Sequence, residues 1–171
     1  MNALTFFASL QALGALIGVA AAVWAQIAYL RALSDGVVSY AERAHLRAIG
    51  VGLRFGLLTV LLSSLGLVIL AYADRAQLQP ALTTSYWVLV GLAALVIVLS
   101  WALARKRVPF LLGSAAAFTA WWFLAYLTLG LLPVSSFGSA VALYVIAVAV
   151  LYAVISYARM RIDLRAYTRL S

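Results

Sequence analysis

Residues 3–33 read ALTFFASLQALGALIGVAAAVWAQIAYLRAL, and they decide the fold of this chain. The stretch carries no charge before Arg31, and it is far longer than the ~20 residues that a helix needs to cross a bilayer. A cleaved signal peptide would begin with basic residues and would have a shorter apolar region. The stretch therefore predicts a retained membrane helix that is tilted or extends into the cytoplasm.

Four further apolar stretches follow, at about 41–73, 85–104, 109–132 and 137–165, and short polar joints separate them. Of all residues, 67% are hydrophobic and 9% are charged, and the mean hydropathy is +1.12. This composition leaves too little polar surface for a soluble monomer. The sequence predicts an all-α integral membrane bundle of five transmembrane helices that forms one domain, residues 1–171.

Positive charge gathers at alternate joints of the chain. Eleven of the twelve Lys and Arg residues follow the first, third and fifth apolar stretches or open the next one: Arg31, Arg43, Arg47, Arg54, Arg105, Lys106, Arg107, Arg159, Arg161, Arg165 and Arg169. Because cytoplasmic loops keep the excess of Lys and Arg, this pattern predicts an outer N-terminus and a cytoplasmic C-terminus. The net charge of +8 then indicates contact with anionic lipid headgroups, not with nucleic acid.

Small residues mark one face on each of the first two predicted helices. Gly14, Gly18 and Ala22 share a face of the helix at 3–33, and Gly52, Gly56 and Gly66 share a face of the helix at 41–73. Both faces contain a GxxxG step, which lets two helix backbones approach closely. We expect the two faces to meet within one chain; the alternative is that one of them forms a homodimer contact.

Several polar residues are candidates for a ligand site or a solute pathway. Gln11, Gln26 and Ser63 are neutral groups inside the predicted helices, where they either line a path for a small solute or bond one helix to another. Arg54 is the only charge near the hydrocarbon region. It is expected to extend to inner-leaflet phosphates, and the alternative is an anionic ligand inside the bundle.

The residues needed for most catalytic and metal sites are absent from the sequence. The chain has no cysteine, which excludes thiolate catalysis and iron–sulfur clusters. Its four carboxylates lie at helix ends, which argues against a metal site and against an ion-coupled pump. His45 is the only histidine, so one chain cannot supply bis-His haem ligation. We expect no metal and no cofactor, and enzymatic activity is disfavoured.

Aromatic residues cluster in the fourth predicted helix. Trp121, Trp122 and Tyr126 lie away from the interfacial positions that an aromatic belt favours. They are interpreted as packing, with a pocket for a lipid, quinone or pigment as the alternative.

These observations favour a non-catalytic membrane subunit or assembly protein in a bacterial inner membrane, acting as a homo-oligomer or within a larger membrane complex. The first alternative is a small transporter or channel that passes a neutral or apolar solute along Gln11, Gln26 and Ser63. The second is a haem- or quinone-binding membrane protein that uses His45 or the Trp121 region.

Overall fold

The described residues of the computed structural model form five long helices and one short 3-10 turn. In chain order they are α1 (Ala3–Asp35), α2 (Tyr40–Ala73), η1 (Pro80–Leu82), α3 (Thr84–Ala104), α4 (Phe110–Thr128) and α5 (Phe137–Thr168). The structure describes residues 3–35, 40–75, 79–132 and 134–168, without the side chains of 32–46, 159 and 162–168. Within this part of the chain, five helices are long and apolar enough to cross a membrane.

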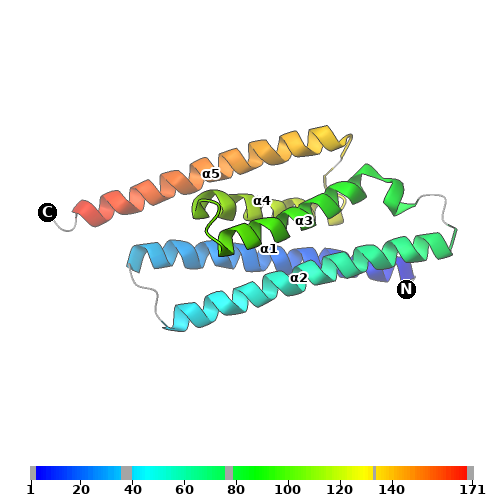
Figure 1. Cartoon of the computed structure of the whole chain (residues 1–171), viewed down its shortest axis with the longest axis horizontal. Coiled ribbons are helices and arrows are strands. Elements are labelled where there is room, and N and C mark those ends of the chain that lie inside the picture. Colours follow the sequence, from blue (N-terminus) through cyan, green and yellow to red (C-terminus); the bar gives the residue numbers. More distant parts are fainter. Residues whose placement is uncertain (1–2, 36–39, 76–78, 133, 169–171) are drawn as a thin grey trace.

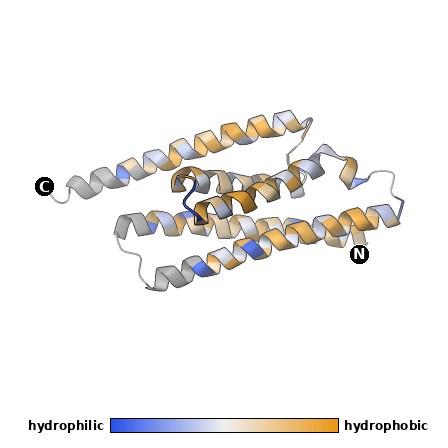
Figure 2. Ribbon diagram, viewed as in Figure 1, coloured by the Kyte–Doolittle hydropathy of each residue, from blue (hydrophilic) through white to orange (hydrophobic). Residues whose placement is uncertain are grey.

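The helices form two antiparallel pairs and a single outer helix (Figure 1). α1 and α2 make the most extensive contact, α4 packs against α1, α3 and α5, and α5 lies along the outside of the α3–α4 pair. Hydrophobic residues dominate the middle of each helix, whereas hydrophilic residues gather toward the ends and in the α3–α4 connection (Figure 2). This arrangement places α4 at the centre of the packed core.

The α1–α2 contact depends on glycine at the crossing point. A Cβ atom added to Gly56 would lie 2.8 Å from the carbonyl oxygen of Gly14 and 3.0 Å from the nitrogen of Gly18. Both atoms belong to the backbone, so only glycine allows this separation. Ala22 is buried on the same face of α1. A Cβ on Gly52 would meet that of Ala21 at an ordinary 3.4 Å.

Two other glycines on these faces lie against aromatic rings. Gly18 lies beneath Trp121 of α4, and a Cβ there would overlap the indole ring. Gly66 lies against the ring of Phe7 in the same way. The two helices therefore meet backbone to backbone where Gly56 crosses Gly14 and Gly18, and large rings lie against Gly18 and Gly66.

The fourth helix is shorter than the sequence predicts. α4 ends at Thr128, whereas the apolar pattern suggested an end near residue 132. Gly130 adopts a left-handed conformation with φ of 69°, its N–H donates to the Leu127 carbonyl, and the N–H of Leu131 donates to the Tyr126 carbonyl. These two bonds form a Schellman motif, which ends a helix at glycine regardless of the apolar residues that follow.

Candidate functional site

The two interior glutamines of α1 bind two different helices. Gln11 Nε2 donates to Ser64 Oγ of α2 over 2.6 Å, and Gln26 Nε2 donates to Ser114 Oγ of α4 over 2.5 Å. At 1.5 Å per residue the two amides lie about 22 Å apart along α1. Each glutamine thus makes its own hydrogen bond to another helix, which lowers the free-energy cost of placing an amide in an apolar environment.

Ser63 does not join these glutamines. Its hydroxyl donates to the backbone carbonyls of Thr59, over 2.5 Å, and Val60, over 3.1 Å, and the residue is fully buried. A polar cavity of about 170 Å³ is lined by Gln11 and Ser64, but neither Gln26 nor Ser63 lines it. The structure therefore does not bring Gln11, Gln26 and Ser63 together around one cavity.

The aromatic residues of α4 divide between the core and the surface. Trp121 is buried against Gly18 with 1% of its surface exposed. Trp122 and Tyr126 are more exposed, with their rings 6.0 Å apart, and they line an open hollow of about 510 Å³ between α4 and α5. Trp121 is thus a packing residue, while Trp122 and Tyr126 border a surface groove.

The two basic candidates of α2 differ in what the structure describes. Arg54 is exposed, next to the exposed residues Phe55 and Leu58, so it lies on the outer surface of α2. This position does not suit an anionic ligand inside the bundle. His45 belongs to α2, but its side chain is not among those that the structure describes. Among the described residues, no group of three His, Cys, Asp or Glu side chains lies close enough to hold a metal ion.

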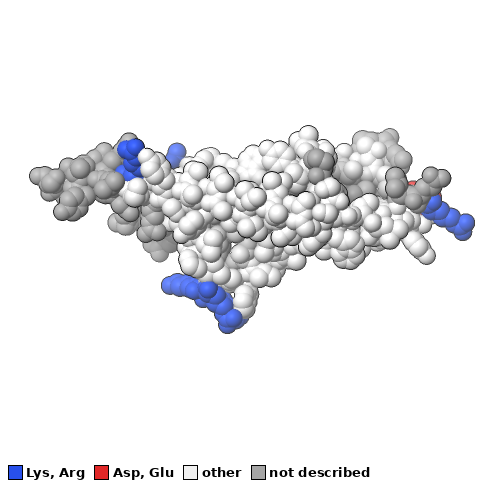
Figure 3. Space-filling model, turned by 90° about the horizontal axis from the view of Figure 1, so that it is seen from above, with Lys and Arg blue, Asp and Glu red and all other residues white. Residues whose placement is uncertain are grey.

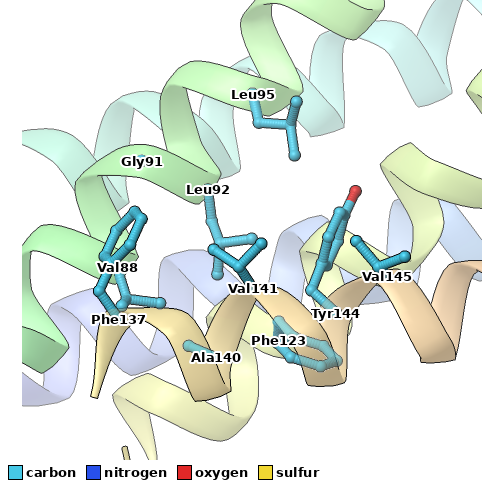
Figure 4. Close-up of a pocket in the computed structure, with 10 residues that line it drawn as sticks. All are labelled: Val88, Gly91, Leu92, Leu95, Phe123, Phe137, Ala140, Val141, Tyr144 and Val145. Carbon is cyan, nitrogen blue, oxygen red and sulfur yellow. The ribbon is translucent and has the colours of Figure 1, made fainter.

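A third cavity lies between α3 and α5, and the sequence analysis did not identify it. It has a volume of about 350 Å³, and its walls are almost entirely apolar. Figure 4 shows residues of α3, including Gly91 and Leu95, facing residues of α5, including Val141 and Val145, across the cavity. Tyr144 bridges from α5 to α4, because its hydroxyl donates to the Ala116 carbonyl over 2.9 Å and its ring meets Phe123 edge to face.

The exposed surface of α5 also carries a row of small residues, none of which lines this cavity. Gly138, Ala142, Ala149 and Ala153 are all exposed, and they fall within about 60° of one another at 100° per residue. A Cβ at Gly138 or Gly91 would meet no atom of the described residues within 4 Å. We call Gly138, Ala142, Ala149 and Ala153 the α5 small-residue stripe. Their spacing is visible in the sequence and was the signal that could have identified this face.

The turn between α3 and α4 carries a basic cluster around one indole. The guanidinium carbons of Arg105 and Arg107 lie 4.6 and 4.8 Å from the ring centre of Trp101, within cation–π range. Lys106 adopts a left-handed φ of 54°, and the N–H groups of Lys106 and Arg107 donate to the carbonyls of Leu103 and Ala102. The Schellman motif at the end of α3 thus presents three exposed cations.

No protein-family model, curated protein or solved structure matches this chain. The assignment of function therefore depends on the chain's own residues.

Proposed function

We propose that this protein is a non-catalytic membrane subunit or assembly protein, and that α5 is the helix that binds its partner. The single observation behind the proposal is the poor burial of α5. Only 6% of the apolar, membrane-spanning segment of α5 is buried inside the protein, compared with 28–50% for the corresponding segments of the other four helices. α5 is attached to the bundle mainly through Ala140, Tyr144 and Ile155, and hollows of about 350 and 510 Å³ lie on its two sides.

Exposure alone does not imply a partner, because lipid covers apolar helix surfaces as well as protein does. Side-chain size separates the two cases, since helix–helix contacts in membranes favour small residues. Every exposed residue of α2 between Val51 and Tyr72 is large, which suits lipid. α5 also exposes large residues, Val145 and Ile146 among them. Its exposed face differs from that of α2 because it carries the small-residue stripe as well, near the α3–α5 cavity that has Gly91 in its wall. This combination favours a transmembrane helix of a partner or of a second copy.

The proposal includes an orientation in a bacterial inner membrane, with the N-terminus outside and the C-terminus in the cytoplasm. It is supported by the basic α3–α4 turn and by exposed Arg31, Arg47 and Arg161, which would all face anionic inner-leaflet headgroups. In Figure 3 a broad uncharged surface separates the Lys and Arg side chains of one half of the molecule from those at the opposite tip.

Position-specific photocrosslinking tests the proposed contact. The chain has no cysteine, so a single Ala142→Cys carries one benzophenone probe on the stripe, and Leu62→Cys carries the control probe on the lipid-facing side of α2. In native membranes we expect one adduct of defined mass from position 142, none from position 62, and loss of the adduct when Ala149→Phe is added. An adduct of twice the chain's mass identifies a second copy. Equal crosslinking at both positions, or none at 142, would refute the proposal.

A further inference from the structure

We infer that the polar cavity at Gln11 is an aqueous pocket that opens at the outer face and binds a small uncharged solute carrying O–H or N–H donors. The inference goes beyond the proposed partner contact and uses only the orientation proposed above. The cavity has a volume of about 170 Å³. Polar lining residues come from four helices, with Gln11 of α1, Ser64 of α2, Ser85 of α3 and Thr128 of α4 among them.

The cavity extends from the outer end of the bundle toward the membrane interior. Pro80, Thr83 and Ser85 lie at the connection between α2 and α3, and Thr128 is the last residue of α4. Gln11 and Ser64 lie deeper, because Ser64 is nine residues before the end of α2 at Ala73, which is about 13 Å at 1.5 Å per residue. Gln11 and Ser64 are bonded to each other, and their remaining donor and acceptor sites offer water or a polar ligand partners at that depth.

The hydrogen bonds already made decide which ligand fits. The hydroxyl protons of Ser64, Thr83 and Thr128 are donated to the backbone carbonyls of Val60, Pro80 and Ala125, over 2.6, 2.7 and 3.0 Å. A hydroxyl whose proton is used offers only acceptor lone pairs. The carbonyl oxygen of the Gln11 amide is a further acceptor. One lone pair of Ser64 and one of Thr83 already accept from Gln11 Nε2 and from the Tyr86 N–H. The hydroxyls of Ser85 and Tyr86 and the second Nε2 proton of Gln11 are donors on the same walls. The matching ligand therefore donates as well as accepts hydrogen bonds, as amides and alcohols do.

Charge on the ligand is disfavoured by the same residues. None of the described residues that line the cavity is an acid or a base, so an ion in the pocket would have no counter-charge. α3 also begins at this wall, beside Thr83 and Ser85, and the positive end of its dipole repels cations. The same dipole attracts anions, but the Thr83 side chain already caps the Tyr86 N–H there. Water is the ligand always present, and small amides and alcohols belong to the same chemical class.

The pocket is closed toward the cytoplasm. Gln11 and Ser64 are bonded to each other at its inner end, and below them fully buried Val60 and Ser63 and the Trp121 ring on Gly18 fill the interior. The ligand is thus expected to enter and leave from the outer side only.

Cysteine accessibility tests the water in this pocket. The cysteine thiolate attacks the thiol sulfur of a methanethiosulfonate reagent and displaces methanesulfinate, and the thiolate forms in water and not in lipid. In sealed vesicles of known orientation, Leu67→Cys and Thr128→Cys, both on the cavity wall, should react with external charged reagent. Ile69→Cys is the matched control on the lipid-facing side of the same helix, where 57% of the native side chain is exposed. Ile69→Cys should react more slowly than the two cavity cysteines, by about tenfold for each unit by which lipid raises the pKa of its thiol.

A pair of similar small molecules tests the preference for donors. Acetamide and acetone are close in size and shape, but only acetamide has N–H donors. Acetamide should slow the labelling of Leu67→Cys by about twofold when its concentration equals its dissociation constant, and acetone should not. The inference is overturned if both cavity cysteines are unreactive, if they react only from the cytoplasmic side, or if the two molecules act equally. None of these results depends on a partner at α5, so failure here is distinguishable from failure of the crosslinking experiment.

Discussion

Replacing Gly56 with alanine should weaken the α1–α2 contact, and the size of the effect follows from the structure. The added Cβ would lie 2.8 Å from the Gly14 carbonyl oxygen, 3.0 Å from the Gly18 nitrogen and 3.2 Å from the Gly18 Cα. All three atoms are backbone, so no side-chain rotation relieves the overlap and the two helices must separate. Overpacking of this kind costs ~1–3 kcal/mol.

Alanine also favours a helix over glycine by ~1 kcal/mol, so Gly56→Ala needs a control with the same propensity gain and no overlap. Gly50 in the same helix provides it, because a Cβ there would meet no described atom within 4 Å. The difference in unfolding free energy between Gly56→Ala and Gly50→Ala therefore measures the overlap alone, ~1–3 kcal/mol. Gly52→Ala, whose Cβ would meet Ala21 at 3.4 Å, should resemble Gly50→Ala.

The assay is reversible unfolding in mixed micelles, with rising SDS fraction and tryptophan fluorescence as the signal. Gly56→Ala should unfold at a lower SDS fraction than Gly50→Ala, and Gly50→Ala should match or exceed the wild type. If Gly56→Ala were as stable as Gly50→Ala, the backbone contact between Gly14 and Gly56 would be absent in the folded protein.

Three further predictions use the same unfolding assay. Gly18→Ala should destabilise the protein because its Cβ overlaps Trp121. Trp121→Leu should lower the unfolding free energy less in the Gly18→Ala background than in the wild type, and strictly additive effects of the two substitutions would contradict this contact. Ser114→Ala should cost ~0.6–2 kcal/mol by removing the Oγ acceptor of Gln26 and leaving the 3.5 Å contact with the Ser114 carbonyl, and an unchanged midpoint would show that the bond to Oγ contributes nothing. Lys106→Gly should stabilise the end of α3 by about 0.5–1 kcal/mol, because glycine adopts the left-handed φ of 54° without steric cost; a loss of stability would mean that the Lys106 side chain is needed there.

The sequence predicted the helices better than their contacts. Helix formation and helix ends depend mainly on residues that are close in sequence. The lengths of the apolar stretches and the positions of Ser, Pro and charged residues therefore indicated five helices of membrane-spanning length. The end of α4 was the exception, because apolar Leu131 and Leu132 follow Gly130 and hide the stop signal that its left-handed conformation provides.

Candidate site residues were harder to place from the sequence. Helical periodicity puts Gln11 and Gln26 inside a helix, but it does not say which helix each one bonds. Trp121, Trp122 and Tyr126 are neighbours in sequence and share one composition signal, yet Trp121 is buried and the other two are exposed. Only the position of α1 and α5 relative to α4 separates their roles.

The sequence by itself determined that this chain consists of apolar helices long enough to cross a membrane, because hydropathy and length act on each segment independently. Tertiary structure decided that Gly14 meets Gly56, that Gln11 and Gln26 serve different helices, and that α5 is left largely uncovered. Those outcomes depend on contacts between residues far apart in the chain, and in lipid these contacts are selected by close packing and hydrogen bonding, not by hydrophobicity. Side-chain shape at the crossing points therefore carries the information that composition lacks.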